Sequence, residues 1–442
     1  MSYPKESGSW KSNFILYLAG RFFLGFGDEI FTFTVSFFIM YQTGSALYAS
    51  INLAIFSVIS LLFLPLAGVV SDSKNKKSII VFGELIDPII LIGLFIYTYL
   101  FGINIVALYI TTGLLTLTSS FVSNAFQSSI TRLFAKEDVQ KVYGYTSTLT
   151  ETASLSGPIV AGALIGLVPF EGIIIFFIVF NMVAVSFDLF LNFEVNKNEE
   201  TINSNTEESK SFINDIIEGV KYIFNNYILR TIVIYLFFVN FITTTLSILP
   251  SKMLIDVLEL PSTFVGVAYA ALSLGGIIGG LIIGNISNFQ TPLLMSKKFS
   301  LIVGLLIVVL PLPIYLTLSD LQNVFFVSIM FIILSISVQF VNTPILSFYQ
   351  TTIPDYIKGR VFSLITVVSM MTMPIGFLFF GFFYDLGAYF TVNLFAGSLI
   401  ILSSVLLLKN KVISKANISY QEEIEREEAE NESINVRETT KH

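Results

Sequence analysis

The sequence predicts an all-α integral membrane protein with twelve transmembrane helices in two six-helix bundles. Three observations support this fold class: 54% of the 442 residues are hydrophobic, only 12% are charged, and the mean hydropathy is +0.80. A soluble domain carries roughly 25% charged residues. With about half that fraction, the surface of this chain could not be solvated by water unless lipid covered most of it. We therefore expect a multi-pass protein of the plasma membrane.

Twelve apolar stretches follow one another along the chain, and each can cross about 30 Å of hydrocarbon as a helix. The first should remain in the mature chain, because it is too long for a signal peptide and carries Arg21, Asp28 and Glu29. The expected spans are 13–40, 46–70, 78–100, 104–130, 141–168, 171–193, 228–254, 262–286, 294–318, 321–351, 359–384 and 388–408.

The basic residues fix the expected orientation, because lysine and arginine are retained on the cytoplasmic side of a membrane. They occur in every second loop and at both ends of the chain, and only Lys252 lies in a loop of the opposite parity. The sequence therefore predicts that both termini are cytoplasmic.

A polar segment near the middle divides the chain into two halves. We expect an amino-terminal bundle over 1–193, a cytoplasmic linker over 194–227, a carboxy-terminal bundle over 228–409 and a disordered acidic tail over 410–442. Within the linker, apolar residues from Phe212 to Ile223 recur at helical spacing, which predicts an amphipathic helix at the cytoplasmic interface. Similar pentapeptides at 126–130 and 349–353 end the fourth and tenth spans, which favours an internal duplication.

Composition also excludes much familiar chemistry. The chain has no cysteine and a single histidine, His442, so thiolate metal sites, cysteine nucleophiles and a Ser-His triad are excluded. We expect no metal, no cofactor and no enzymatic activity. Nucleic-acid binding is not expected either, because the basic residues are spread thinly along one membrane face.

The loop between the second and third spans contains Gly68, Asp72, Lys76 and Lys77. A glycine lets a neighbouring helix approach, and an aspartate at a helix end can accept hydrogen bonds from the N-terminus of another helix. The loop resembles the signature loop of the major facilitator superfamily, although Ser73 stands where the family usually has a basic residue. The resemblance implies a loop that holds the cytoplasmic side of a transporter closed.

The fifth span contains Gly144, Gly157, Pro158 and Gly162. Small residues let two membrane helices pack closely, and proline removes one backbone hydrogen bond, so the helix can bend there. The pattern resembles the antiporter motif of exporters in the same superfamily.

Two further segments resemble one branch of this superfamily, the drug exporters that include macrolide-efflux proteins and the enterobactin exporter. They are Gly27 with Asp28 in the first span, and the segment around Gly359 and Arg360 before the eleventh. The resemblance implies a proton-coupled exporter of a small, largely apolar molecule, and we expect the protein to be a monomer. Its partners would be that substrate, protons and the lipid bilayer.

Charged residues lie deep within the spans of the first half, where each costs about 2.5 to 3.5 kcal/mol at mid-bilayer, and the second half has none at comparable depth. We expect Arg21 to pair with Glu151 or Asp87, while Asp28 or Glu29, with no cation at its depth, exchanges protons. The alternative is that these acids only form structural ion pairs between helices. The intramembrane charges are Arg21, Asp28, Glu29, Glu84, Asp87, Glu151 and Asp188.

The second half supplies aromatic rings and isolated amides that suit an amphipathic ligand. In a chain with 44 phenylalanines, lipid-facing packing is the favoured alternative for such a stripe. The candidate lining residues are Phe237, Phe238, Asn240 and Phe241 in the seventh span, and Gln339 and Asn342 in the tenth.

Together these features predict an exporter that works by alternating access, with its substrate near the midplane between the halves. A proton-coupled symporter importing a small solute shares the topology, but the motif in the fifth span argues against it. A receptor or scaffold that transports nothing would gain no benefit from intramembrane acids.

Overall fold

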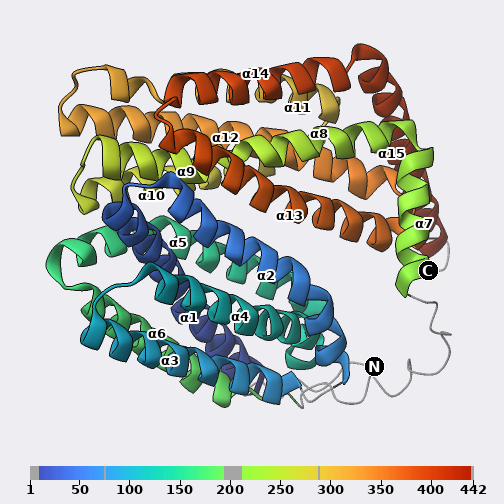
Figure 1. Ribbon diagram of the computed structural model, residues 1–442. Coiled ribbons are helices and arrows are strands. Elements are labelled where there is room, and N and C mark those ends of the chain that lie inside the picture. Colours follow the sequence, from blue (N-terminus) through green and yellow to red (C-terminus); the bar gives the residue numbers. More distant parts are fainter. Residues whose placement is uncertain (1–8, 74–75, 135, 194–211, 287–288, 440–442) are drawn as a thin grey trace.

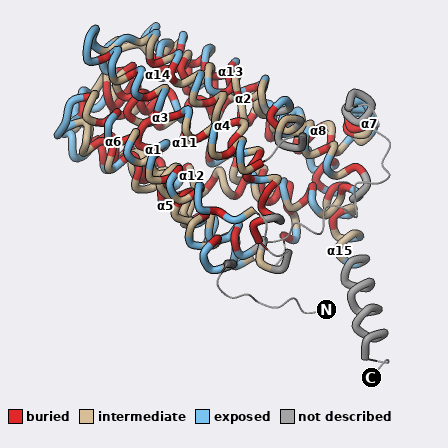
Figure 2. Tube along the Cα trace, turned by 90° about the horizontal axis from the view of Figure 1, so that it is seen from below, coloured by how far each residue is buried: buried red, intermediate tan, exposed pale blue. Residues whose placement is uncertain are grey.

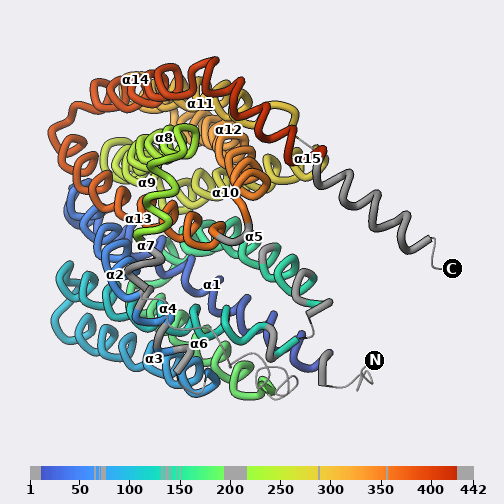
Figure 3. The backbone as a smooth tube through the Cα atoms, turned by 90° about the vertical axis from the view of Figure 1, so that its right-hand side faces the viewer, coloured from blue at the N-terminus to red at the C-terminus, as the bar shows by residue number. Residues whose placement is uncertain are grey.

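The computed structural model describes residues 9–73, 76–134, 136–193, 212–286 and 289–439, and these fold as helices without a strand among them. Figure 1 shows two bundles, with the amino-terminal half in blue to blue-green and green and the carboxy-terminal half in yellow-green to red. Figure 3 shows the same division from the side, with α1 to α6 below α8 to α14. The expected two-bundle arrangement of helices is therefore present.

Six long helices build the amino-terminal bundle. A side-chain cap from Asn104 starts one of them, since its Oδ1 accepts hydrogen bonds from the amides of Val106 and Ala107. The helices are α1 (Ser9–Thr43), α2 (Ala46–Ser73), α3 (Lys76–Phe101), α4 (Ile105–Leu133), α5 (Lys136–Leu167) and α6 (Phe170–Leu189).

Eleven segments of the described chain are long and apolar enough to cross a membrane. The remaining expected span, 141–168, folds as the 32-residue helix α5 but is not among them. Serines, threonines and Glu151 run through the middle of this helix. It packs between α1 and α10, where neighbouring helices replace lipid along much of its length.

The carboxy-terminal bundle departs from the expected continuous seventh span. This span consists of α8 (Tyr227–Thr243), α9 (Thr245–Ser251) and a π-helical turn η1 (Lys252–Val257). Thr244 and Thr245 lie at the interruption, and their hydroxyls donate to the carbonyls of Phe241 and Ile242 in the preceding turn.

The other carboxy-terminal spans lie close to their expected positions. The predicted ninth span continues beyond α11 as a short 3-10 turn, η2 (Leu312–Tyr315), which contains Pro313. The helices are α10 (Ser262–Gly284), α11 (Pro292–Val309), α12 (Asp320–Thr352), α13 (Asp355–Asp385) and α14 (Tyr389–Leu407).

Two further helices pack against the carboxy-terminal bundle. The expected linker helix is α7 (Phe212–Asn225), which contacts α8 and α13. The tail, expected to be disordered, instead forms α15 (Asn410–Thr439). Its first turns bury Val412, Ile413, Ala416 and Tyr420 at helical spacing against α11 and α12, so the acidic composition of the whole tail concealed an amphipathic start.

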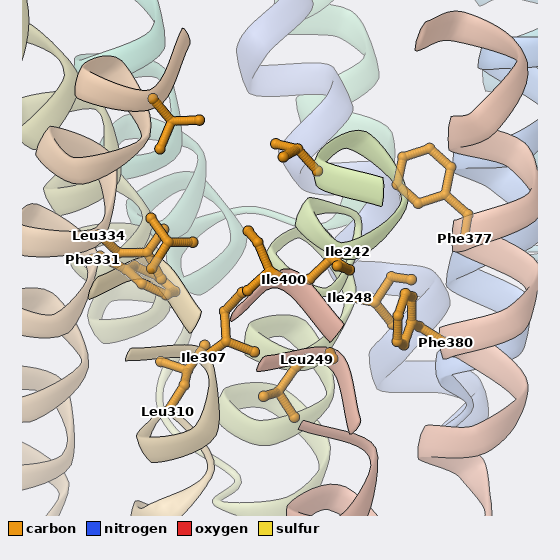
Figure 4. Packing of buried hydrophobic residues seen from close by; sticks show 14 of the residues in the cluster. Ile242, Ile248, Leu249, Ile307, Leu310, Phe331, Leu334, Phe377, Phe380 and Ile400 are labelled. Carbon is orange, nitrogen blue, oxygen red and sulfur yellow. The ribbon is translucent and has the colours of Figure 1, made fainter. Parts of the chain in front are cut away.

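The two bundles meet along two helix pairs, α2 with α13 and α5 with α10. Figure 2 shows buried residues running through both bundles, with exposed residues on their outer faces. Apolar side chains from several helices meet in the carboxy-terminal core (Figure 4): Ile242, Ile248, Leu249, Ile307, Leu310, Phe331, Leu334, Phe377, Phe380 and Ile400.

Candidate functional site

A buried charge cluster joins three helices of the amino-terminal bundle. The Nη2 atom of Arg21 on α1 donates to Glu84 Oε1 on α3 at 2.5 Å and to Asp188 Oδ2 on α6 at 2.7 Å. The two carboxylate side chains are 1% and 0% exposed. The guanidinium also lies 3.7 Å from the ring centroid of Phe126, which adds a cation–π contact. We name Arg21, Glu84 and Asp188 the buried triad.

The expected pairing of Arg21 with Asp87 is wrong. Asp87 instead accepts a hydrogen bond from the hydroxyl of Thr118 on α4, and the side chain of Glu151 lies outside the described residues. Asp188 reaches Arg21 because α1 and α6 approach closely at Gly20, where an added Cβ would lie 2.6 Å from Asp188 Oδ1. The sequence marked Asp188 as an intramembrane acid but gave no spacing that linked it to Arg21.

The buried triad carries two acids for one base. Among the described residues, Arg21 Nε, Glu84 Oε2 and Asp188 Oδ1 are buried atoms without a hydrogen-bond partner. If both acids are ionised, the cluster has one uncompensated negative charge, which is costly in a dry environment. Binding one proton removes that charge, so the arrangement is chemically suited to proton uptake and release.

A cavity between α1, α3, α4 and α6 lies beside the buried triad. Asp28 lines this cavity and is exposed, and the described residues offer it no ion-pair or hydrogen-bond partner. The neighbouring Glu29 differs, because its Oε1 accepts a hydrogen bond from the hydroxyl of Ser154 on α5 at 2.7 Å. The lining residues are Arg21, Leu24, Asp28, Glu84, Asp87, Leu115, Ser119, Val122, Ser123 and Phe177.

The basic pair of the loop between α2 and α3 ties helix ends together within one bundle. Lys76 Nζ donates to the carbonyl of Ser128 at 2.8 Å, and Lys77 Nζ donates to that of Leu191 at 3.0 Å. Such contacts satisfy carbonyls near helix C-termini and favour the helix dipole there. Gly68 is half-buried, whereas the side chain of Asp72 lies outside the described residues.

The small residues of α5 pack tightly against helices of both bundles. An added Cβ at Gly157 would lie 2.6 Å from Glu29 Cβ on α1, and Gly162 lies against Ser262 and Gly266 on α10. Ser262 Oγ also donates to the carbonyl of Gly162 at 2.8 Å.

Pro158 and Gly144 complete the motif in α5. The carbonyl of Pro158 faces Gly266 across the bundle interface, whereas no atom lies within 4 Å of the position of an added Cβ at Gly144. The motif is therefore packed in its second part and open at its start.

The candidate lining residues of the second half do not contribute to the described cavity. Phe241 packs against Phe379 and Phe380 with ring centroids 5.4 and 5.0 Å away, so it belongs to the core. Asn240 Nδ2 donates to Ser369 Oγ on α13 at 3.2 Å. Phe237 and Asn342 are exposed, and Phe238 and Gln339 are half-buried.

The segment at the start of α13 connects with the linker helix. Arg360 Nη1 donates to Glu218 Oε2 on α7 at 2.8 Å, and Gly359 is exposed. Gly219 lets the two helices approach, because an added Cβ would lie 2.7 Å from Leu364 Cδ1. The sequence indicates Arg360 as a candidate residue, but no pattern in it indicates the partner of Arg360 on α7, or Thr118 and Ser154.

Comparison with known families decides the identity of the fold. The family described as Major Facilitator Superfamily matches residues 17–377, most of the chain. The chain belongs to the major facilitator superfamily. It is therefore a transporter rather than an enzyme, and a multi-pass protein of the cell membrane.

Relatives within the superfamily confirm the resemblance to the macrolide-efflux branch. Macrolide efflux protein A of Streptococcus pyogenes is 23% identical over 386 residues, which cover 86% of this chain and 91% of that protein. A protein of the same name from Enterococcus faecalis is 24% identical over 338 residues, covering 75% of this chain and 99% of the relative.

Solved structures of the superfamily share the fold at low identity. A bacterial homologue of the iron transporter ferroportin, in its inward-facing state, aligns with a TM-score of 0.67 at 16% identity, covering 91% of this chain and 98% of that one. A D-xylose-proton symporter aligns with a TM-score of 0.70 at 10% identity over the same shares of the two chains. These similarities show the fold alone, since the neighbours are transporters of different substrates.

Proposed function

We propose that this transporter exports small amphipathic or apolar compounds of the macrolide or multidrug type, driven by protons that move in the opposite direction. In this proposal twelve helices cross the plasma membrane, both termini are cytoplasmic, and the protein works as a monomer. The six-helix bundles rock about a central substrate site. The names of the relatives support the substrate class.

The observation that carries the proton coupling is the excess of acid over base around one cavity of the amino-terminal bundle. The buried triad has two acids for one cation. Asp28 and Asp87 also line this cavity, and its described lining contains no basic residue besides Arg21. Uncompensated carboxylates in a membrane are costly unless they have a function. The carboxy-terminal bundle has no comparable set of acids within its spans.

The proposed conformation is closed at the outer end and open to the cytoplasm. Most described hydrogen bonds between the bundles lie near the connections from α1 to α2 and from α13 to α14, and one, from the Ser273 hydroxyl to the carbonyl of Ser154, lies near the middle of α5 and α10. At the other end of the interface helices, Gly144, Gly280 and Gly359 have no atom within 4 Å of an added Cβ. With cytoplasmic termini, this open end faces the cell interior, where an exporter binds its substrate.

Asp28 is the proposed proton-exchanging acid. It is exposed to the cavity, whereas Glu29 is held by Ser154 and the acids of the buried triad are held by Arg21. Protonation of Asp28 therefore breaks no described bond. The two remaining readings are a proton-coupled importer and a transporter in which these acids are only structural. The tight packing of Gly157 and Gly162 in the exporter-like motif favours export.

The test uses purified protein in sealed liposomes, with ethidium and a macrolide as probes and an imposed pH difference. Wild type is expected to move a probe against its gradient, and a protonophore should abolish that movement. Asp28→Asn should lose the pH-driven movement and retain downhill exchange, because substrate binding does not need the proton. Asp320→Asn is the matched control, since Asp320 is an exposed acid at the first position of α12.

Two results would contradict the proposal. If wild type moves neither probe in response to the pH difference, proton-coupled export is wrong. If Asp28→Asn accumulates a probe as well as wild type does, proton exchange belongs to another acid.

A further inference from the structure

Lys252 is the basic residue that breaks the alternation of charged loops, and the structure shows why it lies there. It is buried at the start of η1, in the carboxy-terminal bundle. Its Nζ lies 2.6 Å from Asp256 Oδ2 and 3.6 Å from Asp385 Oδ1 at the end of α13. The same nitrogen donates to the carbonyl of Gly44, which belongs to the amino-terminal bundle.

Asp385 makes a second connection between the bundles. Its Oδ1 accepts a hydrogen bond from the amide of Ala46 at 2.6 Å, and its Oδ2 accepts one from the amide of Leu47 at 3.0 Å. The hydroxyl of Ser45 donates to Oδ2 at 2.5 Å. Ala46 is the first residue of α2, so an acid of one bundle caps the N-terminus of a helix in the other.

The surrounding backbone is shaped for this contact. Gly44 has a φ of +59°, the left-handed conformation that glycine adopts without strain. An added Cβ at Gly44 would lie 2.6 Å from Asp256 Oδ1. One turn before Asp385, Gly381 lies against Ser50 of α2, where an added Cβ would lie 2.6 Å from Ser50 Cβ. The contact therefore involves close approach of main chains as well as an ion pair.

We propose that Gly44, Ser45, Lys252, Asp256 and Asp385 form an outer gate whose bonds must break in each cycle before substrate can leave. The proposal rests on alternating access in the proposed function. Asp385 and Lys252 are positioning residues: they touch no substrate, and they set how often the outer end opens. When the bundles separate, the first amides of α2 lose the Asp385 carboxylate and Lys252 loses the Gly44 carbonyl, so those bonds favour the closed state.

The gate can be tested by cysteine labelling, because the natural chain has no cysteine. Ser50→Cys reports the outer end, since Ser50 is 0% exposed here. Thr148→Cys on α5 reports the cytoplasmic end, where Thr148 is exposed. A membrane-impermeant maleimide is added to each face of proteoliposomes, and the two labelling rates are measured without substrate or a pH gradient.

Asp385→Ala is expected to raise outer labelling and lower cytoplasmic labelling, so that the ratio of the two rates changes by about tenfold, as loss of one strong helix cap would do. Lys252→Met should give a shift in the same direction. Asp385→Asn keeps an acceptor for the cap and loses the charge, so its shift should be smaller; it also serves if the alanine variant fails to fold. Asp320→Asn, at another exposed acid, should match wild type.

The gate is wrong if Asp385→Ala, Asp385→Asn and Lys252→Met all leave both rates within about twofold of wild type. It is also wrong if Asp385→Asn labels no differently from the control Asp320→Asn while Lys252→Met lowers outer labelling instead of raising it. This assay needs no transported compound. Altered labelling in a protein that moves neither ethidium nor a macrolide would therefore support the gate and contradict export separately.

Discussion

Replacing Arg21 with methionine should destabilise the protein strongly, because it removes the only described cation of the buried triad. Glu84 and Asp188 are 1% and 0% exposed, and each carboxylate accepts a hydrogen bond from the same guanidinium nitrogen of Arg21. Removing one partner of a buried ion pair costs about 3 to 5 kcal/mol. Methionine replaces the apolar stem of arginine at a similar length and lacks only the charged group. Most of the loss of stability should therefore come from the two unpaired acids.

The destabilisation should depend on pH. In the variant, protonating one of the two acids removes a buried charge that has no counter-charge, whereas acids are ionised in the unfolded chain near neutral pH. The folded variant therefore binds more protons than its unfolded state, and its stability should fall as the pH rises. Wild type should depend on pH less, since Arg21 compensates one of the two charges.

This effect can be measured by thermal unfolding of purified protein in detergent. Unfolding is monitored as the loss of the monodisperse peak in size-exclusion chromatography, at several pH values between about pH 6 and pH 8.5. Lys298→Met is the matched control, because Lys298 is an exposed cation near the start of α11. If Arg21→Met unfolds at the temperature of wild type across this range, the charge reasoning is refuted. An equal loss in Lys298→Met would attribute the effect to the change of net charge.

Three further substitutions test packing described above. Gly266→Val should cost about 1 to 3 kcal/mol by overpacking against the carbonyl of Pro158, and it should slow transport in liposomes; a fully active, equally stable variant would contradict the close approach. Tyr420→Ala should lower the unfolding temperature by removing a ring that is 2% exposed, at a cost of about 3 kcal/mol, whereas a disordered tail would show no change. Asn13→Ala should cost about 1 to 3 kcal/mol because the carbonyl of Asn192 loses its donor at 2.8 Å, measured by the same unfolding assay.

Much of the fold could be predicted because hydropathy reports it directly. Apolar length placed the helices within a few residues, and the spacing from Phe212 to Ile223 predicted α7. The interruption at Thr244 was not predictable, because threonine makes the same hydrogen bond to the preceding turn in continuous helices, as Thr98 and Thr118 do here. The tail was predicted to be disordered because its second part is rich in acidic residues. That composition hid the four apolar residues that are buried in the first turns of α15.

The candidate site was predicted in its residues but not in its pairs. Arg21, Asp28 and Glu84 stood out because charge is rare in membrane helices. Their partners depend on the rotation and separation of helices far apart in the sequence, as the contact of Asp188 with Arg21 beside Gly20 illustrates. Asp385 did not stand out in the sequence, because an acidic residue at the end of a span is indistinguishable from an ordinary loop residue.

The helices α7 and α15 both pack on the carboxy-terminal half of the molecule. The main contacts of both helices are with elements of the carboxy-terminal half, and these include Glu218 of α7 with Arg360 and Tyr420 of α15 with Ser347. A fluorescent or paramagnetic reporter placed on either helix would thus follow the tilt of one rigid body. A reporter pair formed by α15 and the start of α3 would read the angle between the bodies directly.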